Sequence, residues 1–227
     1  MVGNLSVNLQ TLKFQQKIFH ILIIKKYTKK FNTMVKGMFL YQDKHTTSQV
    51  SNIKEFFEKL LIEENFDTII EIGTAYAGLT YILDDIRTEN KLNCKIETFD
   101  NAEFHFVKDQ LEPRGIPYNI MDERTEEFKD FVTNMISSGG KTLVLCDGGN
   151  KINEFNFYSD FLKNGDIIMA HDYAESSEFF TENINDKIWN WMEITYDDIK
   201  DSVLINNLIK YDKINFDHAV WCCFKKN

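Results

Sequence analysis

The chain has 227 residues, of which 43% are hydrophobic and 27% are charged, and its formal net charge is −9. This length predicts one globular domain with a large buried core. The acidic balance argues against nucleic acid as a partner, because it repels phosphate backbones, unless the basic N-terminal segment alone does the binding. No apolar stretch approaches the roughly 18 to 20 residues that a membrane span needs, so we expect no transmembrane segment.

The N-terminal part differs in charge from the rest, because residues 1–44 carry eight lysines and a single acid, Asp43. We predict a basic extension over residues 1–40 and one folded domain over residues 41–227. Residues 12–31 mix apolar side chains with lysines and could form a basic amphipathic helix that contacts a membrane surface or an acidic partner. Two alternatives are an ordinary terminal helix and a natural translation start at Met34 or Met38, which would make the extension dispensable.

Four cysteines are present, and none of them forms a C-x-x-C pair. This pattern indicates small core residues in a reducing compartment, not a disulfide framework or a zinc site, so we expect the protein in the cytoplasm.

Apolar segments of strand and helix length alternate along the chain. Strands are expected at residues 68–72, 94–99, 118–121, 142–146 and 166–170, with helices near 48–61, 79–86, 128–136 and 155–162. Near-continuous apolar strands separated by helices imply a parallel sheet covered on both faces. We therefore predict an α/β fold with a Rossmann-like, doubly wound sheet. In the tail, strand-like segments 189–194 and 219–224 flank a helical stretch at 197–209, and residues 218–225 are expected to form an antiparallel last strand.

The junction at residues 68–80 is the most informative segment. An apolar strand containing Glu71 turns through Gly73 and Gly78 into a helix, whose N-terminus points free N–H groups at the loop. Gly73 is expected to allow the tight turn, and Gly78 to allow close approach of the helix to a ligand. The G-x-x-x-x-G spacing differs from the G-x-G-x-x-G of dinucleotide binders and lacks the ending of a P-loop. It favours S-adenosylmethionine, and the alternative is an ordinary strand-to-helix turn.

Two later segments, residues 143–150 (LVLCDGGN) and 162–173 (LKNGDIIMAHDY), resemble class I S-adenosylmethionine-dependent methyltransferases. The similar branch contains the catechol O-methyltransferase-like enzymes and the cephalosporin-hydroxylase and macrocin O-methyltransferase-like group. Its fourth strand typically ends Asp-Gly-x-His, and its fifth ends in one or two acids. The resemblance covers residues 48–175. It implies O-methylation of a small hydroxylated acceptor of the sugar, catechol or natural-product type, but it does not identify the acceptor.

The resemblance also implies positions for the cofactor. It places the methionine part against the loop after the first strand, which contains Glu71, Gly73, Thr74, Ala75, Tyr76 and Gly78. Asp100 would accept hydrogen bonds from the ribose hydroxyls, or alternatively cap the next helix. Met121 or Asp122 would lie at the edge of the adenine, and Asp122 could instead be a helix N-cap. Asp147 completes the predicted cofactor set.

Asp147, His171 and Asp172 stand at the carboxyl ends of neighbouring strands, where open α/β sheets place their active sites. They form a plausible set of ligands for one divalent cation. Carboxylates suit Mg²⁺, and an imidazole shifts the preference toward Mn²⁺ or a softer ion. His171 departs from the acids or amides usual in the similar family. In the alternative interpretation His171 is a hydrogen-bonded strand-end residue and Asp172 a cap.

Two side chains are candidates for a general base. Asn150 occupies a position where similar enzymes often have histidine, and Lys151 follows it. Lys151 could act as base if a nearby cation and desolvation removed its proton, although most lysines are surface residues. His171 could serve instead, because imidazole titrates near neutrality.

Residues 173–191 are aromatic and acidic and are expected to form a lid or an acceptor wall, unless their aromatic side chains are core residues. The fold is compatible with a homo-oligomer. The alternative to an enzyme is a non-catalytic module that binds adenosylmethionine or a partner, because the site departs from the similar family at two positions, Asn150 and His171.

Overall fold

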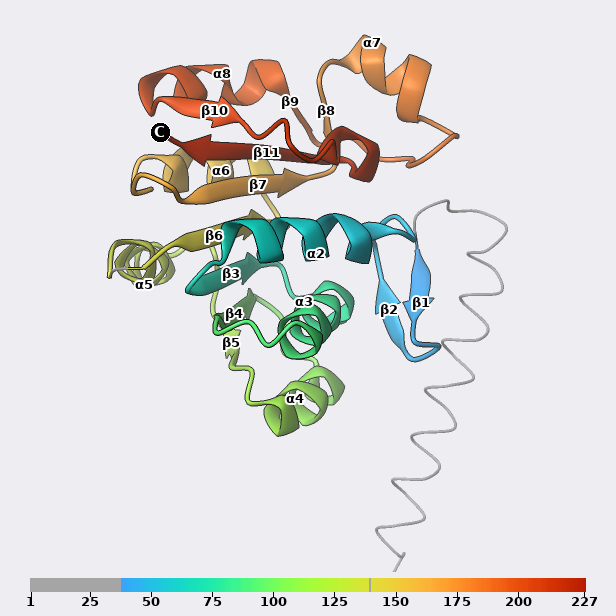
Figure 1. Cartoon of the computed structure of the whole chain (residues 1–227), viewed down its shortest axis with the longest axis vertical. Helices are drawn as coiled ribbons and strands as arrows, with labels where there is room; N and C mark the ends of the chain where they lie inside the picture. The colour runs from blue at the N-terminus through green and yellow to red at the C-terminus, as the bar shows by residue number, and fades with distance from the viewer. Residues whose placement is uncertain (1–37, 139) are drawn as a thin grey trace, which may run out of the picture. The chain divides into compact units, whose positions relative to one another are not determined.

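The computed structural model describes residues 38–138 and 140–227 (Figure 1). Most of the predicted extension therefore lies outside the described residues. The described part begins with a hairpin of β1 (Phe39–Tyr41) and β2 (His45–Thr47), which starts two residues before the predicted domain boundary at residue 41. Among the described helices, none is long and apolar enough to cross a membrane.

A seven-stranded sheet forms the centre of the fold. Its spatial order is β10-β11-β7-β6-β3-β4-β5. The strands are β3 (Thr68–Ile72), β4 (Lys95–Asp100), β5 (Tyr118–Ile120), β6 (Thr142–Cys146), β7 (Ile167–His171), β10 (Leu208–Lys210) and β11 (Trp221–Lys226). The pairs among β3 to β7 are parallel, and β11 is antiparallel to both β7 and β10. The predicted doubly wound sheet with an antiparallel C-terminal strand is confirmed.

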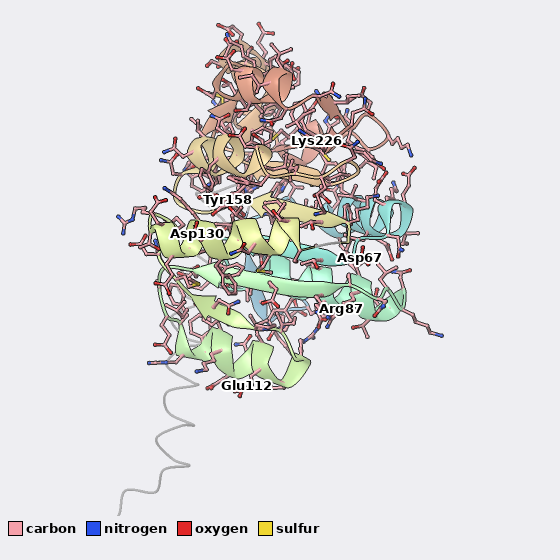
Figure 2. The ribbon with its side chains drawn as sticks, turned by 90° about the vertical axis from the view of Figure 1, so that its left-hand side faces the viewer. Asp67, Arg87, Glu112, Asp130, Tyr158 and Lys226 are labelled. Atoms are coloured by element: carbon pink, nitrogen blue, oxygen red, sulfur yellow. The ribbon has the colours of Figure 1, made fainter. Side chains whose placement is uncertain are left out.

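Helices cover both faces of this sheet. One face carries α2 (Ile53–Glu64), α3 (Gly78–Glu89) and α4 (His105–Leu111), and the other carries α5 (Glu126–Ser137), α6 (Lys151–Ser159) and α8 (Tyr196–Ile205). Alternate residues of each strand feed the two cores, as Ile69 and Ile70 do on β3, because successive strand side chains point to opposite faces. In Figure 2, Asp130 marks α5 and Tyr158 marks α6 in this second layer.

The C-terminal third contains the main differences from the expected elements. Of the predicted strand at 189–194, only the last residue is in a strand, β9 (Ile194–Thr195), which pairs with β8 (Tyr173–Ala174) outside the main sheet. Between them lie α7 (Ser177–Phe179) and a π-helical turn at Phe180–Ile184. The predicted helix at 197–209 ends early, because Asn207 adopts a left-handed conformation and Leu208 begins strand β10. Residues 208–210 form a strand because they pair with the antiparallel strand β11. The helical spacing of apolar residues does not reveal this pairing.

The four cysteines are buried and free, as the sequence predicts. Three of them lie in central strands: Cys146 on β6, and Cys222 and Cys223 on β11. They act there as small apolar residues of the core.

Gly78, the first residue of α3, has a different role from the one expected. An added Cβ would lie 2.7 Å from the Cα of Thr47 and would also clash with the carbonyl oxygen of Thr46. The missing side chain therefore lets α3 pack against strand β2. The expectation that Gly78 makes room for a ligand is wrong, because its Cβ direction is filled by the hairpin.

We predict that Gly78→Ala lowers the free energy of unfolding by about 1 to 3 kcal/mol, the usual cost of an extra methyl group in a filled site. Chemical denaturation measures this difference. The control is Thr88→Ala at an exposed position of the same helix, which should change stability by less than about 0.5 kcal/mol. A Gly78→Ala protein as stable as the control would contradict the close packing of α3 on β2.

Candidate functional site

The candidate site lies where the direction of strand order reverses, between β3 and β6. Open α/β sheets bind ligands in the crevice outside the carboxyl ends of such strands. Gly73 follows β3 with φ +96°, and an added Cβ would clash with the carbonyl oxygen of Asp147 and lie 2.8 Å from the nitrogen of Gly148. Only glycine fits here, because both the backbone angle and the neighbouring loop exclude a side chain.

A cleft of about 200 Å³ opens at this crossover. Five residues of the predicted cofactor set line it: Gly73, Ala75, Asp100, Met121 and Asp147. Sequence reasoning did not identify the other lining residues, which are Ile72, Phe99, Asn101, Glu123, Phe128, Gly148 and Gly149. Asn101 and Glu123 directly follow the predicted Asp100 and Asp122. Their position next to a strand end could therefore have identified them as cleft residues from the sequence.

Asp100 fixes the conformation of the loop after β3. Its Oδ2 accepts a hydrogen bond of 2.7 Å from the backbone nitrogen of Ala75, and its Oδ1 accepts one of 2.9 Å from that of Ala102. Ala75 has φ +45°, a left-handed conformation that few alanines adopt. The carboxylate stabilises this turn, and each oxygen keeps a lone pair that can accept a further hydrogen bond from a ligand.

Glu71 lies beneath the loop and does not line the cleft. Its side chain is buried, and its Oε2 accepts hydrogen bonds from Thr80 Oγ1 at 2.5 Å and Thr98 Oγ1 at 2.7 Å. Burial raises the pKa of Glu71 to about 8, although the two hydroxyl hydrogen bonds oppose the shift. Thr74 is buried in the same network, 2.5 Å from Thr98 between their hydroxyl oxygens. Both residues thus hold the loop in place from below.

Two other predicted cofactor residues also lie off the cleft lining. Tyr76 is 45% exposed, and its ring packs against those of Phe104 and Phe106 at centroid distances of 5.6 and 6.1 Å. Asp122 forms an ion pair with Arg124 at 2.8 Å, which holds the pKa of its carboxyl at about 2. The alternative that Asp122 caps a helix is wrong, since Thr125 is the N-cap of α5.

The structure brings Asp147, His171 and Asp172 together beside the cleft. His171 Nδ1 lies 3.1 Å from Asp147 Oδ1 and 3.6 Å from Asp172 Oδ1. The imidazole is buried between the rings of Trp189 and Trp221, at centroid distances of 5.2 and 4.8 Å. Burial lowers the pKa of His171, but the carboxylates of Asp147 and Asp172 outweigh it and raise the pKa above its ordinary value.

Lys151 is the fourth member of this cluster. Its Nζ lies 2.7 Å from Glu193 Oε2, 3.2 Å from Asp172 Oδ2 and 3.6 Å from Asp147 Oδ1. Burial lowers the pKa of Lys151, but these three carboxylates more than compensate and raise it above its usual range. Lys151 is therefore protonated at neutral pH, the opposite of what its predicted role as base requires. Glu193 was missed, because the sequence around it offers no motif.

Two more buried residues missed by sequence reasoning hold Asp147 and its loop. Gln49 donates from Nε2 to Asp147 Oδ2 at 3.2 Å, and its Oε1 accepts from Trp221 Nε1 at 2.8 Å. Glu154 accepts from the backbone nitrogens of Gly148 and Asn150 at 3.2 and 3.1 Å, and burial raises its pKa to about 7. The position of Asp147 is thus fixed from both sides.

The predicted ligands converge, but their surroundings do not fit a divalent ion. The ammonium of Lys151 already contacts both carboxylates. His171 Nε2 is buried and has no hydrogen-bond partner among the described residues, whereas metal-bound histidines almost always donate their other ring N–H.

No protein-family model and no curated protein sequence matches the chain. Solved structures do. A candidate caffeoyl-CoA O-methyltransferase from Staphylococcus aureus is 12% identical with a TM-score of 0.54, over 96% of this chain and 100% of that one. The apo-structure of CmcI-N160 is 11% identical with a TM-score of 0.52, over 78% and 71%.

The structure of CmcI-N160 with S-adenosylhomocysteine is 12% identical with a TM-score of 0.51, over 78% of this chain and 77% of that one. At these identities the likeness concerns the fold. The chain therefore has the class I methyltransferase fold, with its cleft at the crossover between β3 and β6.

Glu71 generates a prediction about pH and stability. Between pH 4.5 and about 8 the folded protein keeps a proton on Glu71 that the unfolded chain has lost, so the free energy of unfolding falls as pH rises through this window. The slope from this group is at most about 1.4 kcal/mol per pH unit. Glu71→Gln removes it, and denaturation at pH 5.5 and 8.5 should show wild type losing stability relative to the variant. A constant difference between the two proteins would contradict the raised pKa.

Proposed function

We propose that the protein is an S-adenosylmethionine-dependent methyltransferase that methylates a hydroxyl group of a small-molecule acceptor. The observation that carries this proposal is the cleft at the crossover, where Gly73, Asp100 and Asp147 converge from three strand ends. The likeness to a structure with bound S-adenosylhomocysteine supports it. A dinucleotide is a weaker candidate, because the loop lacks the tighter glycine pattern.

The cleft offers the contacts that this cofactor needs. Gly73 and Ala75 present backbone to the cofactor, and Asp100 has acceptor capacity left for the ribose hydroxyls. Met121 and Phe128 supply apolar surface for a flat base. The bound cofactor would supply a sulfonium methyl group for in-line transfer, and the protein would align the acceptor and exclude water.

Asp147 is the member of the charged cluster that lines the cleft, so we propose that the acceptor hydroxyl bonds to it. The carboxylate would hold the hydroxyl and take its proton as the methyl transfers. Lys151 and His171 contact Asp147 on the side away from the cleft and would position it. The raised pKa of Lys151 keeps its ammonium group protonated, which disfavours a role as base. Glu123 in the cleft lining and Glu193 in the charged cluster add negative charge, which favours a neutral or cationic acceptor over an anionic one.

The segment after β6 argues against a nucleic-acid acceptor. It reads Asp147-Gly-Gly-Asn150. An enzyme that methylates amino groups of nucleic acids is expected to have Asp/Asn-Pro-Pro-Tyr/Phe at this place. A cytoplasmic location fits the free, buried cysteines.

Asp100→Asn should weaken S-adenosylhomocysteine binding by about 1.5 to 3 kcal/mol, the value of a hydrogen bond to a charged group, which is at least a tenfold loss. Calorimetric titration measures it. Asp109→Asn, at an exposed position on α4, is the matched control and should bind like wild type. Equal affinity of both variants would rule out the ribose contact, and tighter binding of a nicotinamide dinucleotide would rule out the proposed cofactor.

Transfer itself is tested by incubating the protein with labelled methyl donor and a panel of sugars, catechols and small phenols. We expect labelled product with at least one hydroxylated acceptor, and more than about a hundredfold slower transfer by Asp147→Asn, on the scale of lost general-base catalysis. Tight cofactor binding with no turnover on any acceptor would favour the alternative, a non-catalytic adenosylmethionine-binding module.

A further inference from the structure

One lysine sits at the centre of the charged cluster beside the cleft. We propose that the ammonium group of Lys151 is a built-in cation that fills the place of a divalent metal ion between Asp147 and Asp172, so that this protein binds no metal there. Cation binding can be measured without cofactor or acceptor. A result that refutes the role of Lys151 therefore leaves the proposed methyl transfer standing, and a protein without methyl transfer could still have the lysine in place of a metal ion.

The ammonium has a full set of partners. Lys151 Nζ lies 2.7 Å from Glu193 Oε2 and 3.2 Å from Asp172 Oδ2, and it donates to the carbonyl oxygen of Gly148 at 3.3 Å. These contacts account for the three N–H donors of a lysine. Asp147 Oδ1, at 3.6 Å, adds a fourth oxygen to the shell. The side chain is only 7% exposed, so these contacts are shielded from water.

Each carboxylate oxygen of Asp147 and Asp172 has a protein partner, and one oxygen of each faces the ammonium. Asp172 Oδ1 accepts from Trp189 Nε1 at 2.6 Å, and its Oδ2 faces Lys151. Asp147 Oδ2 accepts from Gln49, and its Oδ1 faces both Lys151 and His171. Mg²⁺ would require these oxygens at about 2.0 to 2.1 Å in a near-octahedral shell. An ion there would lie within a few ångströms of the ammonium and would repel it.

Glu193 completes the arrangement. Its backbone nitrogen donates to the carbonyl oxygen of Asp172 at 2.9 Å, which anchors it beside the end of β7. With Glu193 included, three carboxylates surround Lys151 and His171. The third acid brings the carboxylates to three beside the two basic side chains, so the buried ammonium is fully paired.

The test compares Mn²⁺ binding by the full-length wild type with binding by Lys151→Met. The paramagnetic resonance signal of free Mn²⁺ measures the binding. Methionine keeps much of the length of lysine but removes its charge. We expect no saturable binding to wild type below about 1 mM, the weak end of protein cation sites. Lys151→Met should bind one Mn²⁺ at least about tenfold more tightly, since the competing charge is gone. Lys108→Met, an exposed lysine on α4, is the matched control and should behave like wild type.

Adding Asp147→Asn to Lys151→Met should abolish the gained binding, which assigns the ion to this cluster. A folded Lys151→Met protein that gains no Mn²⁺ affinity would overturn the proposal. The wild-type titration decides independently of whether the variant folds. Tight Mn²⁺ binding by wild type that Asp147→Asn removes would show that the ion displaces the lysine.

Discussion

The arrangement of the site depends on the close contact between two loops, one after β3 and one after β6. Gly73 leaves no space for a side chain against the backbone of Asp147 and Gly148. This contact brings the glycine loop and the first acid of the charged cluster to the same cleft. It also follows from the topology, because the two strands are neighbours at the point where the strand order reverses.

Buried polar networks hold each side of this contact in place. Beneath the glycine loop, Glu71 joins α3 to β4 through the hydroxyls of Thr80 and Thr98. Beside the second loop, Glu154 binds backbone nitrogens, and its raised pKa of about 7 follows from burial. Such satisfied networks fix one geometry, and they cost stability when a partner is lost. The residues that contact a ligand are therefore fewer than the residues that shape the site.

Much of the fold could be predicted from the sequence, because apolar strands of four to six residues separated by amphipathic helices have few possible arrangements. The parallel strands and the convergence of Asp147, His171 and Asp172 were correctly expected. Contacts made by the irregular segments, the edge strand and the hairpin could not be predicted. Glu193 reaches Lys151 only through the pairing of β8 with β9, and strand β10 depends on the edge that β11 provides. The same limit applies to Gly78, whose neighbour is a distant hairpin.

The central claim is that the crossover cleft binds the adenosyl cofactor. Hydrogen exchange of backbone amides, with and without S-adenosylhomocysteine, tests it most directly because it reports every loop in one measurement. The account predicts slower exchange at residues 73–78, 100–102 and 147–149, with little change in the β10–β11 edge. Protection confined to other segments, or none at saturating ligand, would contradict the assignment of this cleft.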